Sequence, residues 1–210
     1  MVNVNAEFDQ RELKKLTDAL KHIPKECQSG LISAVNRSVK TTNTAMQKAI
    51  TQRYNIKKQS LTNGDFKSKS SSQLITVRKA TKNSLNADIL IEGHRLSFDV
   101  KRGMVSPKQP KSHKGKTIKQ IKRIAQPKVK ILKGKQKTYK HSFIATGRGG
   151  TVGLFSRDKS SGKLVMQRTL SVAHMARQRQ IAEATQKSAR EALTKNIAHE
   201  IEYRLQKVSK

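Results

Sequence analysis

The sequence has few acidic, aromatic and cysteine residues. Only 14 of its 210 residues are Asp or Glu, aromatic residues make up 4%, tryptophan is absent, and there is one cysteine. That single cysteine, Cys27, excludes an intramolecular disulfide and a cysteine-rich zinc site. The scarcity of aromatic side chains argues against recognition of unpaired bases by stacking. No apolar run approaches the roughly 20 residues that a membrane-spanning helix requires.

The N-terminal residues also lack a targeting signal. Residues 1–10 have no basic start followed by an apolar stretch, so no secretory signal peptide is visible. We therefore expect the protein to work in a reducing interior, or in a particle assembled there, and not at a membrane.

Positive charge dominates what is present. The 45 Lys and Arg residues outnumber the 14 Asp and Glu residues, which gives a formal net charge of +31. Leu, Ile, Val and Phe together number 47 of 210 residues, or 22%. This fraction is only just above the roughly 20% at which a highly charged chain is expected to be disordered. We expect a single domain over residues 1–210 with a thin core. A polyanion or an oligomeric neighbour would relieve its self-repulsion.

Hydrophobic periodicity predicts an α+β fold. Helical spacing of apolar residues predicts helices over about 10–22, 25–54 and 172–207 and a short helical segment over 56–61. Alternation predicts strands over 74–79, 86–92, 95–101, 129–133, 138–146, 151–157 and 163–169. The predicted organisation is N-terminal helices in 1–61, a largely antiparallel sheet in 74–101 and 129–169, a basic arm in 102–128 and a long final helix.

The pattern also predicts a hairpin that places two carboxylates together. Strands 86–92 and 95–101 pair across the Gly93-His94 turn with residue numbers summing to 187, which sets Asp88 opposite Asp99. With Lys101 nearby, this resembles a metal-dependent nuclease centre, in which acids hold the cation and a lysine orients the attacking water. The spacing is common, however, and nothing obviously completes the site. A solvated face is therefore the better interpretation.

Other catalytic patterns have weaker support. The glycines of Gly147-Arg-Gly-Gly150 lie between two predicted strands, whereas a phosphate-binding loop precedes a helix, so we expect a hairpin turn there. The six histidines show no metal-ligand spacing. We therefore expect no enzymatic activity, no bound metal and no cofactor.

The strongest signal is an acid-free basic block. Residues 101–141 contain 15 Lys or Arg and no acid. Most are lysines, which act as point charges and carry little base-reading geometry, so we expect sequence-independent attraction to phosphates. If about 6–10 of them engage DNA, affinity falls roughly 10³–10⁵-fold between about 50 and 200 mM salt. An acidic protein surface would satisfy the same charges, and a solvated face is the remaining alternative. The candidate polyanion-binding residues are Lys108, Lys111, Lys114, Lys116, Lys119, Lys122, Arg123, Lys128, Lys130, Lys133, Lys135, Lys137, Lys140 and Arg148.

Several segments, in order, resemble one protein family. Residues 141–157, His-Ser-Phe-Ile-Ala-Thr-Gly-Arg-Gly-Gly-Thr-Val-Gly-Leu-Phe-Ser-Arg, resemble a strand–turn–strand block of the minor tail protein Z family of tailed phages and prophages. Residues 95–99 and 129–140 resemble strands that precede this block. Ala34-Val-Asn-Arg37 and Ala198-His-Glu-Ile201 match helical segments of the family. The resemblance spans about residues 27–207.

The resemblance implies a structural component of the virion. Family members complete the tail at its neck, near the head-proximal end, and sixfold tail symmetry implies a hexameric ring. Its expected partners are further copies of the chain, the tail terminator or tail tube, the head–tail connector and double-stranded DNA in the lumen. Assembly would take place in the host cytoplasm. A monomeric, ribosomal-style nucleic-acid-binding protein is the alternative.

Overall fold

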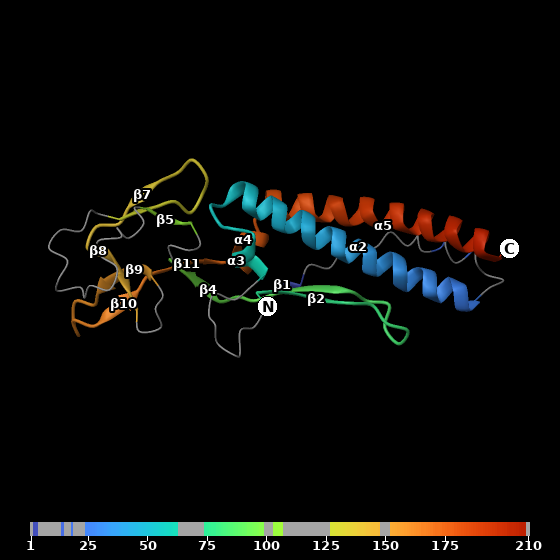
Figure 1. The fold of residues 1–210 in the computed structure, drawn as a ribbon, viewed down its shortest axis with the longest axis horizontal. Coiled ribbons are helices and arrows are strands. Elements are labelled where there is room, and N and C mark those ends of the chain that lie inside the picture. The colour runs from blue at the N-terminus through green and yellow to red at the C-terminus, as the bar shows by residue number, and fades with distance from the viewer. Residues whose placement is uncertain are drawn as a thin grey trace. The chain divides into compact units, whose positions relative to one another are not determined.

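The computed structural model of the chain describes residues 2–3, 14, 18, 24–62, 74–98, 103–106, 127–147 and 152–208. Its elements confirm the α+β class, and all strand pairs within these ranges are antiparallel (Figure 1). The helices are α2 (Pro24–Arg53), α3 (Gln59–Thr62), α4 (Val172–Ala176) and α5 (Arg179–Val208). The strands are β1 (Val2–Asn3), β2 (Ile75–Arg78), β3 (Asp88–Ile91), β4 (Arg95–Ser97), β5 (Val105–Ser106), β6 (Lys128–Val129), β7 (Lys137–Thr138), β8 (Ser142–Thr146), β9 (Val152–Arg157), β10 (Leu164–Met166) and β11 (Arg168–Ser171).

The chain forms two compact units. The helical unit comprises residues 1–49, 73–92 and 176–210, and the sheet unit comprises residues 50–72 and 93–175. The division falls within α2, between β3 and β4, and at the last residue of α4. The single domain expected over 1–210 therefore stays a prediction, which one cooperative unfolding transition would support.

In the helical unit, α2 and α5 pack together beside the sheet β1-β3-β2 (Figure 1). The predicted α2 stripe is confirmed, and Ala34 and Val35 are buried against Leu193 and Ile197 of α5. Asn36 attaches the segment that follows β2. Its side-chain amide donates to the carbonyl of Ala80 at 3.1 Å and accepts from that residue's N–H at 2.8 Å.

A buried carboxylate links the same two helices. Glu200 on α5 is 2% exposed and accepts a hydrogen bond from the Ser33 hydroxyl at 2.6 Å. The Arg204 guanidinium donates to its other oxygen at 3.1 Å, and an Arg37 nitrogen lies 3.4 Å from the first. Gly30 leaves the space that Arg204 fills, since a Cβ there would stand 3.0 Å from Nε. The cluster compensates a charge that would otherwise be costly to bury.

The sheet unit contains three small sheets. These are β10-β9-β8, β5-β6-β7 and the pair β11-β4. Phe98, at the end of β4, joins two of them, because its N–H donates to Gln167 at 3.1 Å and its carbonyl accepts from Leu154 at 2.9 Å. Its buried ring meets Tyr139 edge-on with centroids 5.6 Å apart.

The predicted hairpin of strands 86–92 and 95–101 is wrong. β3 pairs with β2 and β1 in the helical unit, whereas β4 pairs with β11 in the sheet unit. Ile89 and Leu96 are both buried, as the alternation predicted. Alternation identifies the face that each strand buries, but it does not identify the neighbouring strand.

Several predicted elements differ in extent, among them the strand 163–169, which is divided into β10 and the first residues of β11. The strand 138–146 is two strands, β7 and β8, because the chain turns at His141, whose φ is 59°. The strand 129–133 is reduced to β6, and the helix 172–207 is divided into α4 and α5. The apolar stripe that predicted this helix lies within α5, so it carried no information about residues 172–178. The first predicted helix and the basic arm lie almost entirely outside the described residues.

The predicted turns at both ends of β9 agree with the pairing. The register of β8 and β9 closes with Thr146 opposite Val152, which makes the intervening glycine-rich segment a hairpin connection. The β9–β10 turn contains Gly162 at a φ of 62°. Asp158 in this turn accepts hydrogen bonds from the hydroxyls of Ser161 and Ser160, which hold the pKa of its carboxyl at about 2.

We predict that Glu200→Ala lowers the free energy of unfolding by about 3–5 kcal/mol, because the Arg204 guanidinium loses its buried partner. Urea denaturation measures the change. The matched control is Glu191→Ala, which removes a 66% exposed carboxylate 3.9 Å from Lys187 and should cost about 0–1 kcal/mol. Equal losses in the two variants would contradict the structural role of Glu200.

A second prediction concerns Gly153 in β9. A Cβ at this position would stand 2.8 Å from the carbonyl oxygen of Phe98 and would clash with the Met166 methyl group. Gly153→Ala should therefore destabilise the protein by about 1–3 kcal/mol, the usual cost of overpacking. Gly93→Ala is the control, because nothing lies within 4 Å of its built Cβ. Thermal unfolding that ranks the two variants alike would refute the close approach of β9 and β4.

Candidate polyanion-binding surface

The two units share the charge of the chain unequally. The helical unit has 19 Lys and Arg against 11 acids, whereas the sheet unit has 26 against 3. The sheet unit therefore carries 23 of the 31 net positive charges. Concentration of one sign on part of a protein creates a field that attracts a polyanion.

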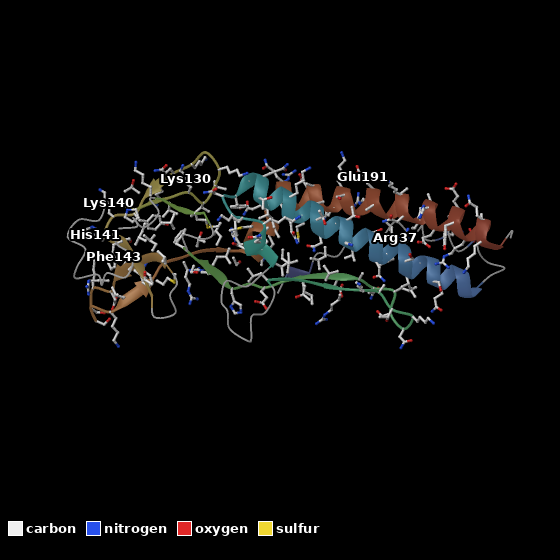
Figure 2. The ribbon with its side chains drawn as sticks, in the orientation of Figure 1. Arg37, Lys130, Lys140, His141, Phe143 and Glu191 are labelled. Carbon is white, nitrogen blue, oxygen red and sulfur yellow. The ribbon has the colours of Figure 1, made fainter. Side chains whose placement is uncertain are left out.

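Six of the predicted binding residues fall in the described ranges, and all six are exposed. They lie on and between β6, β7 and the turn before β8, and Figure 2 shows two of them, Lys130 and Lys140, in that part of the sheet unit. We call these six residues the lysine surface: Lys128, Lys130, Lys133, Lys135, Lys137 and Lys140.

The alternation of side chains explains why the first two residues of the lysine surface are exposed. Lys128 and Lys130 flank Val129, which is 1% exposed and pairs with the buried Val105. Because successive strand residues point to opposite faces, both lysines lie on the face away from this core. The Lys130 backbone N–H donates to Met104 at 2.8 Å, which holds the chain in place.

The next two lysines lie on an anchored turn. Residues 131 and 133 bond the end of α2, with the Asn55 N–H donating to Ile131 at 2.9 Å and the Lys133 N–H to Arg53 at 3.0 Å. Gly134 then takes a φ of 78°, which a glycine adopts at little cost. The Lys133 and Lys135 side chains therefore extend from a turn whose backbone is held in place.

The last two residues of the lysine surface, Lys137 and Lys140, lie on either side of an aromatic ring that packs in the core. The Lys137 ammonium lies 6.0 Å from the centroid of the Tyr139 ring, a cation–π arrangement. That ring packs edge-on against Phe98, and the Tyr139 N–H donates to Pro127 at 3.1 Å. Lys140 follows at the turn into β8, so the two lysines flank a side chain anchored in the core.

Within the described residues, no carboxylate forms an ion pair with the lysine surface. The described ion pairs lie in the helical unit, at Glu183, Glu191 and Glu200. The lysine ammonium groups are thus available to an external anion. Lysine bonds phosphate as a point charge, so contacts of this kind with a phosphate backbone would not read its bases.

The remaining predicted binding residues lie outside the described residues: Lys108, Lys111, Lys114, Lys116, Lys119, Lys122, Arg123 and Arg148. The structure adds three exposed cations that the block did not include, namely Arg157, Lys163 and Arg168 around β10. They were missed because they stand outside the acid-free block, on either side of Asp158.

The nuclease hypothesis loses its geometric basis. Asp88 lies opposite Arg78 in the β2–β3 register, and Asp99 is outside the described residues. Among the residues that the structure describes, no group of three His, Cys, Asp or Glu is placed to hold a metal ion. The two aspartates are thus not brought together by the predicted hairpin.

The fold and the surface define a strongly basic α+β protein with one intensely charged unit. None of its described helices is long and apolar enough to cross a membrane. Residues 11–210 match the family model described as prophage minor tail protein Z. The chain therefore belongs to this family of phage tail proteins. Comparisons with curated proteins and with solved structures found no match.

Membership confirms the resemblance found in the sequence. The structure shows what the two matching helical segments contact. Residues 34–37 on α2 and 198–201 on α5 contact each other, since Arg37 pairs with Glu200 and Ala34 packs in one cluster with Ile201. The segments that matched the family therefore hold the helical unit together. The lysine surface lies in the other unit.

Proposed function

We propose that the chain is a structural, non-catalytic tail-completion protein at the neck, where a ring of copies surrounds the path of the DNA. The observation that carries the proposal is the lysine surface, six exposed lysines in a unit that has 26 cations against 3 acids. Family membership supports a role in the tail. The sixfold symmetry of tails favours a hexamer, which would bring 186 formal positive charges to the ring.

The lysine surface is proposed to contact the DNA backbone in the lumen. Contacts through lysine to phosphate are independent of sequence and release counterions. They suit a protein past which an entire genome must move, because no base sequence is held in preference to another. An acidic neighbouring ring is the other partner that these charges would accept.

A charge-matched pair of variants tests this contact. The first variant changes the six residues of the lysine surface to Gln. The second removes the same charge from exposed cations of the helical unit, through Lys40→Gln, Lys79→Gln, Lys82→Gln, Lys187→Gln, Arg190→Gln and Lys195→Gln. Fluorescence anisotropy with a duplex of about 30 base pairs, between about 50 and 200 mM salt, gives the affinity and its salt slope.

We expect the lysine-surface variant to reduce the log–log salt slope by up to about 5, since each lost phosphate contact removes about 0.9. The control variant should change it much less. Equal slopes in both variants would mean that net charge alone binds DNA and would contradict the proposed surface. A selective loss of binding to polyglutamate, with DNA binding unchanged, would assign the surface to an acidic neighbour.

Particles made without the protein test its place in the virion. We expect electron microscopy to show tails that fail to join filled heads or fail to deliver DNA, with infectivity restored by the protein supplied in trans. Infectious, normally joined particles in its absence would overturn the neck assignment. That result would favour a nucleic-acid-binding role outside the virion.

A further inference from the structure

The outer edge of β10 is a second candidate interaction surface. β10 is the outer strand of the sheet β10-β9-β8, and no strand in the described ranges pairs with its free side (Figure 1). Leu164 is 43% and Val165 46% exposed. Because neighbouring strand residues point to opposite faces, β10 presents apolar side chains on both faces of the sheet.

The register shows which backbone groups point outward. The Asp158 N–H donates to Lys163 at 2.9 Å and the Gln167 N–H donates to Leu154 at 2.8 Å, so alternate residues of β10 face β9. In an antiparallel pair the residues between them direct their N–H and C=O groups away from the partner. Leu164 and Met166 therefore present these groups to the free edge.

This edge lacks the usual protection against strand addition. Proteins commonly protect edge strands with charged residues, proline or bulges. β7, at the edge of the β5-β6-β7 sheet, follows that rule with an exposed lysine at 137. β10 consists of Leu, Val and Met, with no charged residue among them.

Cations surround the edge. Arg157, Lys159, Lys163 and Arg168 are exposed within the β9–β10 hairpin or two residues beyond it. Among the residues that the structure describes, the acid in this hairpin is Asp158, whose Oδ2 already accepts hydrogen bonds from Ser160 at 2.7 Å and Ser161 at 2.6 Å. A partner strand that brings carboxylates would therefore meet uncompensated positive charge.

We propose that β10 binds an extended segment of a different protein in which apolar and acidic residues alternate. Strand addition would satisfy the outward backbone groups of Leu164 and Met166, and the apolar residues, which lie on one face of the added strand, would cover the face that carries Leu164. The β10 edge of a second copy fits poorly, because it would bring the same exposed cations, Arg157, Lys163 and Arg168, against one another. The hydrogen-bonded β9–β10 turn keeps β10 in place before binding, which lowers the entropic cost.

The test uses a fluorescein-labelled peptide, Glu-Val-Glu-Val-Glu-Val-Glu, and an equally charged Glu-Gly repeat that forms strands poorly. Leu164→Pro removes an outward N–H and leaves the alternation toward β9 intact, as edge positions tolerate. Leu164→Thr keeps the N–H and removes apolar surface. Leu85→Thr is the control, because Leu85 is also 43% exposed but lies in the helical unit.

We expect the Glu-Val peptide to bind the unmodified protein. Leu164→Pro should raise its dissociation constant about threefold to tenfold, because the variant loses one net hydrogen bond to the peptide. Leu164→Thr should weaken binding less, and Leu85→Thr should leave it within about twofold. Equal binding of the Glu-Gly peptide, or equal affinity in all variants, would reduce the interaction to general charge attraction and overturn the proposal.

Amide hydrogen exchange on the unmodified protein gives a readout that does not depend on variants folding. Bound Glu-Val peptide should slow exchange at Leu164 and Met166 and leave the already bonded Val165 nearly unchanged. Unaltered exchange at the two outward amides would overturn the proposal. So would sedimentation showing a dimer that Leu164→Pro dissociates, because the edge would then bind a second copy.

Discussion

The placement of a few carboxylates among many cations governs this structure. Glu200 is the clearest case, since it lies buried between α2 and α5 and is compensated by Ser33, Arg37 and Arg204. A carboxylate in that position favours one alignment of the two helices, because a shift of a turn would separate Glu200 from Ser33 and Arg37 on α2 and leave one of its buried oxygens without those partners. The other described ion pairs follow along α5.

The sheet unit, in contrast, has only three acids to compensate its 26 cations. Its core is apolar and aromatic, with Phe98 hydrogen-bonded to two strands and packed on Tyr139. Its lysines extend outward from short strands and anchored turns. A unit built in this way gains stability from an anion laid against it, because bound anions reduce the repulsion that opposes the folded state. The lysine surface and the β10 edge are both proposed to bind acidic partners, the first through ion pairs with phosphate groups and the second through strand pairing.

Sequence periodicity predicted the local elements well and their neighbours poorly. The α2 helix and the faces that bury Ile89 and Leu96 follow directly from spacing. The partners of β3 and β4 did not follow, because two alternating strands joined by Gly93-His94 suit a hairpin as well as they suit two separate sheets. Of the fourteen predicted binding residues, six lie in the described ranges as exposed side chains, while the cations around β10 required the sheet pairing to be recognised.

The sequence by itself determined the net charge, the α+β class, the helical stripes and the lysines available to an anion, since these depend on composition and on side-chain period. Tertiary structure alone decided that Arg37 meets Glu200, that β3 and β4 belong to different sheets, and that β10 is an edge strand among the described strands. Those outcomes depend on contacts between residues far apart in the chain. Such contacts form only where side chains pack well and buried charges are compensated at the same time. The local sequence pattern therefore does not predict them.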